Sequence, residues 1–389
     1  MPSFYRVPGR ASFSEFTRAS SLKLVRPAAT ARALSRSRIA SGEETLTSCL
    51  TRVGGPEIHI GDVGTQSVSI VAASLNKASG LHLGPVKGAN TLKVSGNTVE
   101  IVASAKNVAK GVDAGKGADV TIGSSNAESV SIAGIKTGES QEGADEQAYG
   151  IFNVNQAQTK VYGKTVNVVA KGAKDTRAIH VANNTEAQDK SATLTIVGDE
   201  VCITAESDDP DHSTVGISAM SHGQVHITGN TVVTASDAIV ARGSSVVSIN
   251  ADGRHYTQIN GNVNFSYDAP TSGTSVDATV VLNLVGPESS WTGNMVVTWN
   301  GTPTNKDEYL SVTGMKLGLS KGAVWTPVET GHDSTTVTLG QKYTALNLLE
   351  NNDGVINITD SAIDVTVEKM TGTGGTVNLA ADLTAEEGS

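Results

Sequence analysis

The chain is poor in cysteine and in aromatic residues. Its 389 residues include two cysteines, Cys49 and Cys202, and neither lies in a C-x-x-C pair. This scarcity excludes zinc ribbons and disulfide-stapled scaffolds. Aromatic residues make up 4% of the chain, whereas hydrophobic residues as a whole make up 38%. A core of Val, Ile, Leu, Ala and Thr suits a thin, stacked sheet structure better than a rounded globule, because few rings are available to fill the interior.

Long apolar runs and helical periodicity are also missing. No stretch approaches the roughly 18 consecutive apolar residues of a membrane-spanning helix. After residue 55 no sustained i, i+3, i+4 pattern of apolar residues occurs, and such a pattern is the signature of an amphipathic helix. We therefore expect an all-β chain that is soluble, or anchored by something outside it.

Basic charge is scarce beyond the first 55 residues. Residues 1–55 hold nine of the 29 basic and three of the 39 acidic residues, which leaves 20 basic and 36 acidic residues, a net charge near −16, for the rest. An acidic body disfavours nucleic-acid binding, which needs a basic face. We expect residues 1–55 to be a disordered or mis-started leader, although their Arg- and Ser-rich composition also fits a transit peptide. No apolar core of a secretory signal peptide is visible.

One phrase recurs along the chain: an alternating apolar run, a glycine and a second alternating run. It reads TLKVSGNTVEIVA at 91–103, TKVYGKTVNVVA at 159–170 and TLTIVGDEVCITA at 193–205, with a shorter copy, QVHITGNTVVTA, at 224–235. Strand periodicity sends alternate residues to opposite faces. The second run of the three full copies is therefore predicted to bury Val99, Ile101, Ala103 and their counterparts Val166, Val168, Ala170, Val201, Ile203 and Ala205.

A further short strand and a polar turn precede several of these glycines, so that the unit is strand, turn, strand, turn, strand. A single unit cannot bury its apolar side, whereas stacked units share one core. The pattern predicts a right-handed parallel β-helix, a solenoid like that of pectin lyase, and a string of β-sandwiches is the main competitor. The residues predicted to stack at the centre of successive coils are Val112, Ile151, Ile179, Ile217 and Ile239.

The motifs of the C-terminal third differ from the recurring unit, and they resemble motifs of a known family. All three tryptophans, Trp291, Trp299 and Trp325, lie within 35 residues. The stretch LGLSKGAVW (317–325) resembles the L-x-L-x-x-G-A-x-W phrase of pertactin-like passenger domains of bacterial type V autotransporters, and SWTGN (290–294) resembles their W-x-G phrase. MTGTGGTVNL (370–379), followed by Ala381-Asp382-Leu383, is similar to the entry to their autochaperone segment.

This resemblance implies a protein displayed at the bacterial cell surface or outer membrane, or secreted, and often associated with virulence. It implies a non-enzymatic adhesin whose partner is a host-cell or matrix glycoprotein or glycan, together with an outer-membrane translocator barrel in cis if the full gene encodes one. No strands of that barrel are recognised before Ser389. The resemblance also implies a structural folding nucleus at the C-terminal end, which we assign to Trp291, Trp299, Trp325, Leu379 and Leu383.

We accordingly divide the chain into a leader (1–55), β-helix coils (56–282) and C-terminal rungs leading into an autochaperone-like segment (283–389). Recognition is expected along one face of the coils and at the longer loops 137–148 and 206–214, because loops on a stiff scaffold commonly carry binding sites. Two alternatives stay open. The chain could be a carbohydrate-active β-helix enzyme, a polysaccharide lyase or hydrolase, or it could be a structural spacer.

No catalytic, metal or cofactor site is predicted. The histidines at 212, 222 and 226 lie in a strand-like segment, where residues four apart are about 13 Å from each other, too far to share a metal ion. The acidic run 208–211 lacks the glycine and glutamate spacing of a calcium loop. GVDAGKGA (111–118) departs from the P-loop pattern, and His332-Asp333-Ser334 cannot converge as a triad because the three residues are consecutive. Cys202 is expected to be an outward, free thiol.

Overall fold

The computed structural model describes residues 46–48, 57–62, 64–84, 90–139, 145–172, 174–183, 191–268, 278–300, 314–328, 343–359 and 363–380. Within these ranges every regular element is a β-strand, so the chain is all-β, as predicted. No helix of the described part is long and apolar enough to cross a membrane. Apart from β1 (Leu46–Ser48), the predicted leader lies outside the described residues.

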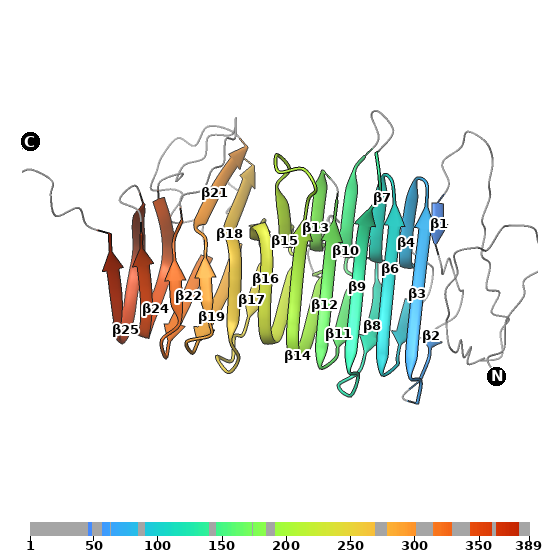
Figure 1. Cartoon of the computed structure of the whole chain (residues 1–389), viewed down its shortest axis with the longest axis horizontal. Helices are drawn as coiled ribbons and strands as arrows, with labels where there is room; N and C mark the ends of the chain where they lie inside the picture. Colours follow the sequence, from blue (N-terminus) through green and yellow to red (C-terminus); the bar gives the residue numbers. More distant parts are fainter. Residues whose placement is uncertain are drawn as a thin grey trace, which may run out of the picture. The chain divides into compact units, whose positions relative to one another are not determined.

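The chain forms two compact units, Met1–Ile227 and Thr228–Ser389, and the boundary falls within β16 (Gln224–Arg242). The change of composition noted at residue 283 therefore lies inside the second unit. Figure 1 shows the strands of each unit. The first unit contains β1, β2 (Glu57–Ile60), β3 (Ser67–Ser74), β4 (Lys77–Leu83), β5 (Asn90–Val94), β6 (Thr98–Ala105), β7 (Val108–Ala114), β8 (Ala118–Gly123), β9 (Ser129–Lys136), β10 (Gln147–Val154), β11 (Gln158–Tyr162), β12 (Thr165–Lys171), β13 (Asp175–Ala182), β14 (Thr193–Glu206) and β15 (Thr214–Met220).

Most strands of the first unit pair in parallel with the strand three places further along the chain. This produces three ladders: β2–β5–β8–β11–β14, β3–β6–β9–β12–β14 and β1–β4–β7–β10–β13–β15. Strand β14 serves two ladders, because Thr193–Val197 pairs with β11 and Glu200–Glu206 pairs with β12. The chain thus visits three ladders in turn and then returns to the first in register.

The predicted inward residues of the recurring phrase are buried, which confirms its period of two. Val99, Ile101 and Ala103 are fully buried, and their partners on β9, β12 and β14 continue the same columns. The shorter copy is shifted by one residue relative to its glycine, since it buries Thr231 and Val233. Each inward side chain therefore packs on a similar one from the neighbouring strand, at the ~4.8 Å spacing of hydrogen-bonded strands.

The predicted central residues stack as expected in the first unit. Val112 lies opposite Ile151, Ile151 opposite Ile179, and Ile179 opposite Ile217. The column also includes Leu81, which pairs with Val112. The fifth predicted member, Ile239, pairs with Val263 in the second unit.

Glycine precedes the central residues Val112, Ile151 and Ile217, and at the first two positions neighbouring backbone comes very close. A Cβ on Gly111 would lie 2.6 Å from the carbonyl oxygen of Gly150 and 2.8 Å from a methyl carbon of Ile132. Gly150 meets the carbonyl of Ala178 at the same 2.6 Å. Real Cβ atoms do not approach other atoms so closely, so these glycines are required for space where the third ladder packs against the second.

The second unit repeats the parallel pairing with larger inward residues. Its strands are β17 (Val246–Ile249), β18 (Thr257–Asp268), β19 (Thr279–Val285), β20 (Ser290–Thr292), β21 (Met295–Asn300), β22 (Gly314–Ser320), β23 (Val324–Thr326), β24 (Tyr343–Ile358) and β25 (Asp364–Leu379), together with most of β16. One inward column joins the ladders from β16 to β24, and it runs Val233, Ile259, Trp291, Trp325, Ile356.

Candidate functional site

The outward residues of the third ladder of the first unit gather the densest set of reactive side chains in the described structure. Parallel register places the residue after each central one in a single row, which reads His82, Asp113, Phe152, His180, Ser218. A second row reads Ser79, Lys110, Tyr149, Arg177, Val215. We call the outer cluster the set His82, Lys110, Asp113, Tyr149, Phe152, Asp175, Arg177, His180 and Ser218.

Phe152 is the centre of the outer cluster. The His180 ring stacks on it, with centroids 5.1 Å apart and an interplanar angle of 20°, and the Lys110 ammonium lies 3.5 Å from its ring centroid. Tyr149 lies at its side, with centroids 5.0 Å apart. A cation over a ring face is attracted by the ring quadrupole. Histidine and lysine therefore already occupy the Phe152 ring, which leaves little of it for stacking on a ligand.

A hydrogen-bonded chain runs along one side of the outer cluster. The Tyr149 hydroxyl donates to Asp175 Oδ2 at 2.5 Å, and Arg177 Nε donates to Asp175 Oδ1 at 2.7 Å. Arg177 also donates to Ser218 Oγ at 3.2 Å and lies 3.2 Å from His180 Nδ1. Burial, and then the Asp175 charge, raise the pKa of Tyr149. Burial, and then the Arg177 charge, lower the pKa of His180 to about 3.

A second polar pair lies at the other side. His82 Nδ1 is 2.9 Å from Asp113 Oδ2, and Lys110 Nζ is 3.5 Å from Asp113 Oδ1. Burial opposes ionisation of Asp113, but the hydrogen bond with His82 and the Lys110 charge outweigh it and hold the pKa of Asp113 below its ordinary value. At neutral pH the outer cluster therefore presents an ionised Asp113, a neutral His180 and a protonated Tyr149.

The outer cluster was missed by sequence reasoning, although a signal for it existed. Its members come from strands 26 to 41 residues apart, so no local pattern contains them. The central residues Val112, Ile151, Ile179 and Ile217 were identified from the sequence, and the residue after each one is a cluster member. Reading one position beyond the predicted central column would have revealed Asp113, Phe152, His180 and Ser218.

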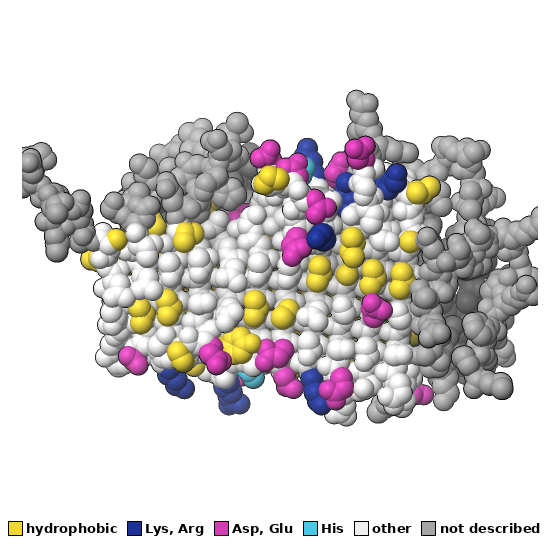
Figure 2. All heavy atoms as spheres, viewed as in Figure 1, with side chains coloured by type: hydrophobic (Ala, Val, Ile, Leu, Met, Phe, Trp, Pro, Cys, Tyr) yellow, Lys and Arg dark blue, Asp and Glu magenta, His cyan; other side chains and the backbone are white. Residues whose placement is uncertain are grey.

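The second ladder presents a plainer outer face. Its outward row Val71, Val102, Ala133, Val169 is apolar and in register, and Figure 2 shows hydrophobic side chains in a row over these strands. A second outward row on the same ladder ends at Cys202, which lies opposite Asn167. Cys202 is half-buried and free, which confirms the predicted outward thiol. Burial raises the pKa of this thiol, so it is a weak nucleophile at neutral pH.

The loop between β14 and β15 is acidic and largely exposed. Asp209 organises it: its carboxylate accepts from the Asp211 backbone N–H at 3.0 Å and lies 3.6 Å from His212 Nδ1. His222 lies in a turn with φ 64°, whereas His226 is on β16 and burial lowers its pKa. Among the described residues no group of three or more His, Cys, Asp and Glu side chains could hold a metal ion. The loop at 137–148 is described only at 137–139 and 145–148.

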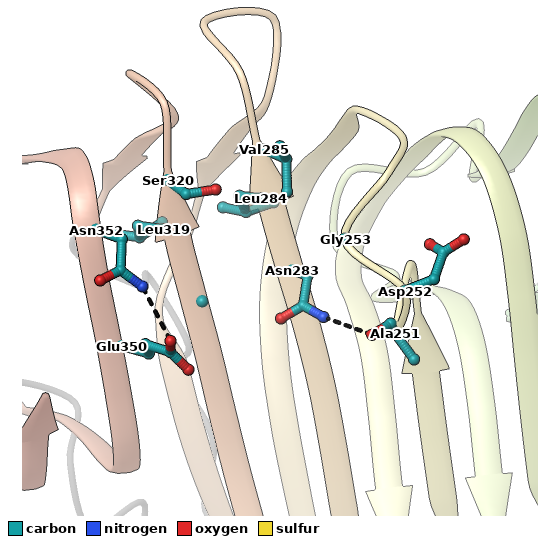
Figure 3. Close-up of a pocket in the computed structure, with 11 residues that line it drawn as sticks. Ala251, Asp252, Gly253, Asn283, Leu284, Val285, Leu319, Ser320, Glu350 and Asn352 are labelled. Carbon is teal, nitrogen blue, oxygen red and sulfur yellow. Dashed lines mark hydrogen bonds between the residues drawn. The ribbon is translucent and has the colours of Figure 1, made fainter. Parts of the chain in front are cut away.

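The second unit contains an open hollow of about 260 Å³ on its outer surface. Figure 3 shows its lining, which comes from the turn after β17 and from strands β19, β22 and β24. Its polar side chains are those of Asp252, Asn283, Ser320, Glu350 and Asn352. Sequence reasoning did not predict this hollow, because its walls are contributed by four segments spread over about a hundred residues.

Two of the residues assigned to the folding nucleus pack against each other. Trp291 and Trp325 are fully buried and stacked, with centroids 5.1 Å apart and an interplanar angle of 10°. Their indole N–H groups donate to the carbonyls of Gly261 and Gly293 at 3.0 and 3.2 Å. Trp299 lies opposite Tyr267 on β21, and its side chain is outside the described set. Leu379 is 66% exposed and does not join the tryptophan core, and Leu383 lies outside the described residues.

Comparisons with known proteins add no relative. No protein-family model matches the chain, and neither the curated proteins nor the solved structures yielded a significant match.

The tryptophan stack leads to a test of the nucleus. We expect Trp325→Ala to destabilise the second unit by about 3–5 kcal/mol, since it removes a large buried ring and leaves the Gly293 carbonyl without its donor. If the stack forms early in folding, refolding slows; if it forms late, unfolding speeds up instead. Stopped-flow tryptophan fluorescence in urea measures both rates. Leu379→Ala is the matched control, expected to change stability by less than about 0.5 kcal/mol, and an equal cost for it would restore Leu379 to the nucleus.

The buried His180 predicts a stability that depends on pH. Its folded pKa of about 3 lies below its ordinary value of 6.5, so the unfolded chain takes up the proton first as pH falls. The stabilising contribution is fully present above about pH 6.5 and is lost toward pH 3, at up to ~1.4 kcal/mol per pH unit. Thermal unfolding midpoints measured from pH 7 to 4 should therefore fall more steeply for the parent chain than for His180→Gln. Equal slopes would show that His180 is not buried in its neutral form.

Proposed function

We propose that the chain is a right-handed parallel β-helix whose coils are the rungs of a surface-displayed binding protein. Parallel pairing recurs at most third strands in the first unit and mostly at every second or third strand in the second, and this recurrence supports the architecture in each unit. Small inward residues in register support it further, because a solenoid gains its stability from nearest-neighbour stacking of like side chains. A string of β-sandwiches would need antiparallel hairpins, and the pairings of the described strands are parallel.

We further propose that it is a passenger domain of the pertactin-like autotransporter type, displayed at or released from the bacterial surface. The support is the structural role of the residues in the two resembling motifs. Leu317, Leu319, Ala323 and Trp325 of the L-x-L-x-x-G-A-x-W phrase all point into the core, and the turn between them has φ values of 54° at Lys321 and 81° at Gly322. The W-x-G phrase supplies the stacked Trp291 and the Gly293 carbonyl that Trp325 binds.

The activity that we propose is adhesion, with a host-cell or matrix glycoprotein or glycan as the partner and a translocator barrel in cis as the anchor. One observation carries this proposal: a stiff, in-register scaffold presents the outer cluster and the acidic loop after β14 from the same unit. The ring contacts and ion pairs of the outer cluster hold its side chains in place without a ligand. Pre-ordered side chains reduce the entropy lost on binding a large partner.

Adhesion should depend on the loops. Beads coated with the purified chain are expected to attach to cultured host cells, and replacement of residues 137–145 and 206–213 by Gly-Ser sequences should reduce attachment about tenfold or more, because loops supply much of the recognition on rigid scaffolds. Lys116→Ser, in the exposed turn between β7 and β8, is the control and should leave attachment unchanged. Attachment that survives the loop replacement would favour the structural spacer instead.

A second candidate function, a carbohydrate-active enzyme, is favoured by the outer cluster itself. Asp113 and Asp175 share one face with Lys110, Arg177 and His180, and glycoside cleavage uses paired carboxylates or a base beside a cation. Against it, the pKa of Asp113 is lowered, so Asp113 is not poised to donate a proton as a carboxylic acid.

The adhesin proposal predicts that the purified chain releases no products from polyuronates or neutral polysaccharides. Reducing ends and the absorbance of unsaturated uronyl groups measure hydrolysis and elimination, respectively. Product release that disappears in Asp175→Asn, while circular dichroism shows the fold intact, would establish the enzyme and overturn the adhesin.

A further inference from the structure

The bottom of the hollow in the second unit is an outward strand position that carries no side chain. Parallel register places Asn283 of β19 opposite Gly318 of β22, and Gly318 opposite Glu350 of β24. A Cβ on Gly318 would lie 2.7 Å from Asn283 Oδ1. The φ angle of Gly318 is not in the left-handed region, so glycine is not needed there for backbone conformation. What the glycine provides is room, a gap between an amide and a carboxylate whose strands lie about 10 Å apart.

The polar groups around this gap are oriented by contacts within the protein. Asn283 Nδ2 donates to the carbonyls of Asn250 and Ala251, at 3.0 and 3.2 Å, which turns Oδ1 toward Gly318. Asn352 Nδ2 donates to Glu350 Oε1 at 2.9 Å, and Thr373 in turn binds Asn352 Oδ1. Figure 3 shows the side chains of Asn283 and Asn352 on opposite sides of the hollow.

These contacts leave hydrogen-bonding capacity directed outward. Within the described structure, Asn283 Oδ1, Glu350 Oε2 and Ser320 Oγ have no protein hydrogen bond. The first two are acceptors and the third can donate or accept. Half-buried Val285 adds apolar surface beside them, whereas the side chains of Leu284 and Leu319 point into the core. The hollow is therefore suited to a small molecule that offers several hydroxyl donors next to a C–H surface.

We propose that this hollow binds a single neutral saccharide unit, through adjacent hydroxyls that donate to Glu350 and Asn283. The volume of about 260 Å³ accommodates one pyranose ring. Glu350 is the one carboxylate facing the gap without a cation beside it, since Asp252 lies 4.0 Å from Arg254, so a divalent ion that needs several carboxylates would be poorly held. The excess of acceptors likewise disfavours phosphate. The inference rests on the proposed function, because it names a ligand class for a protein that acts by binding.

The test uses the purified full chain and ligand-observed NMR with glucose, galactose, mannose and N-acetylglucosamine, and with calcium alone and inorganic phosphate alone as separate arms. We expect weak binding of at least one sugar. Glu350→Gln should weaken it about tenfold or more, because a hydrogen bond to a charged acceptor is lost. Gly318→Ser should abolish it by filling the gap, and the only close atom is the end of the Asn283 side chain, so the fold should tolerate the change.

Gly374→Ala is the matched control, since a Cβ there meets no atom within 4 Å, and its binding should equal that of the parent. Sugar binding that neither Glu350→Gln nor Gly318→Ser reduces would overturn the inference, as would a response to calcium or phosphate alone. Absence of sugar binding together with loop-dependent attachment of coated beads would overturn the saccharide site and leave the adhesin standing. Loss of both would remove the proposed function as well.

Discussion

The structure depends on one interaction, the in-register stacking of small inward side chains from parallel strands. Val99, Val130, Val166 and Val201 form one such column, and Ile101, Ile132, Val168 and Ile203 form the next. No strand could bury these residues alone, because its own turn of chain offers nothing to cover them. Once each column is filled, the register of the outward residues is determined too, since a slip by one position would turn every apolar side chain outward.

This coupling explains where chemistry can arise in the molecule. A row of outward side chains can be assembled from residues 26 to 41 apart in sequence, and the outer cluster is one example. A single omitted side chain in such a row creates a hollow, as at Gly318. Sites of both kinds are built on strands held from beneath, and at the hollow a turn also helps to orient Asn283. Binding surfaces can thus change by outward substitution while the core stays the same.

The two units solve the packing problem with different residues. The first uses Val, Ile and Ala, and its backbones approach closely enough to require Gly111 and Gly150. The second contains the two stacked indoles, each of which donates to a glycine carbonyl on, or directly after, the preceding strand of its own ladder. A buried ring that also donates a hydrogen bond contributes more stability at one position than a single valine does.

The sequence alone determined the all-β class, the alternation of inward and outward residues and the stacking of Val112, Ile151, Ile179 and Ile217, because these follow from local periodicity repeated at each turn of chain. The sequence also indicated that Trp291 and Trp325 have a structural role. Only tertiary structure decided that Leu379 is exposed, that the shorter copy after Gly229 is shifted by one residue, and that Asp175, Tyr149 and His180 meet. Those facts depend on which outward residues come opposite one another across turns of unequal length, and local sequence contains no measure of that register.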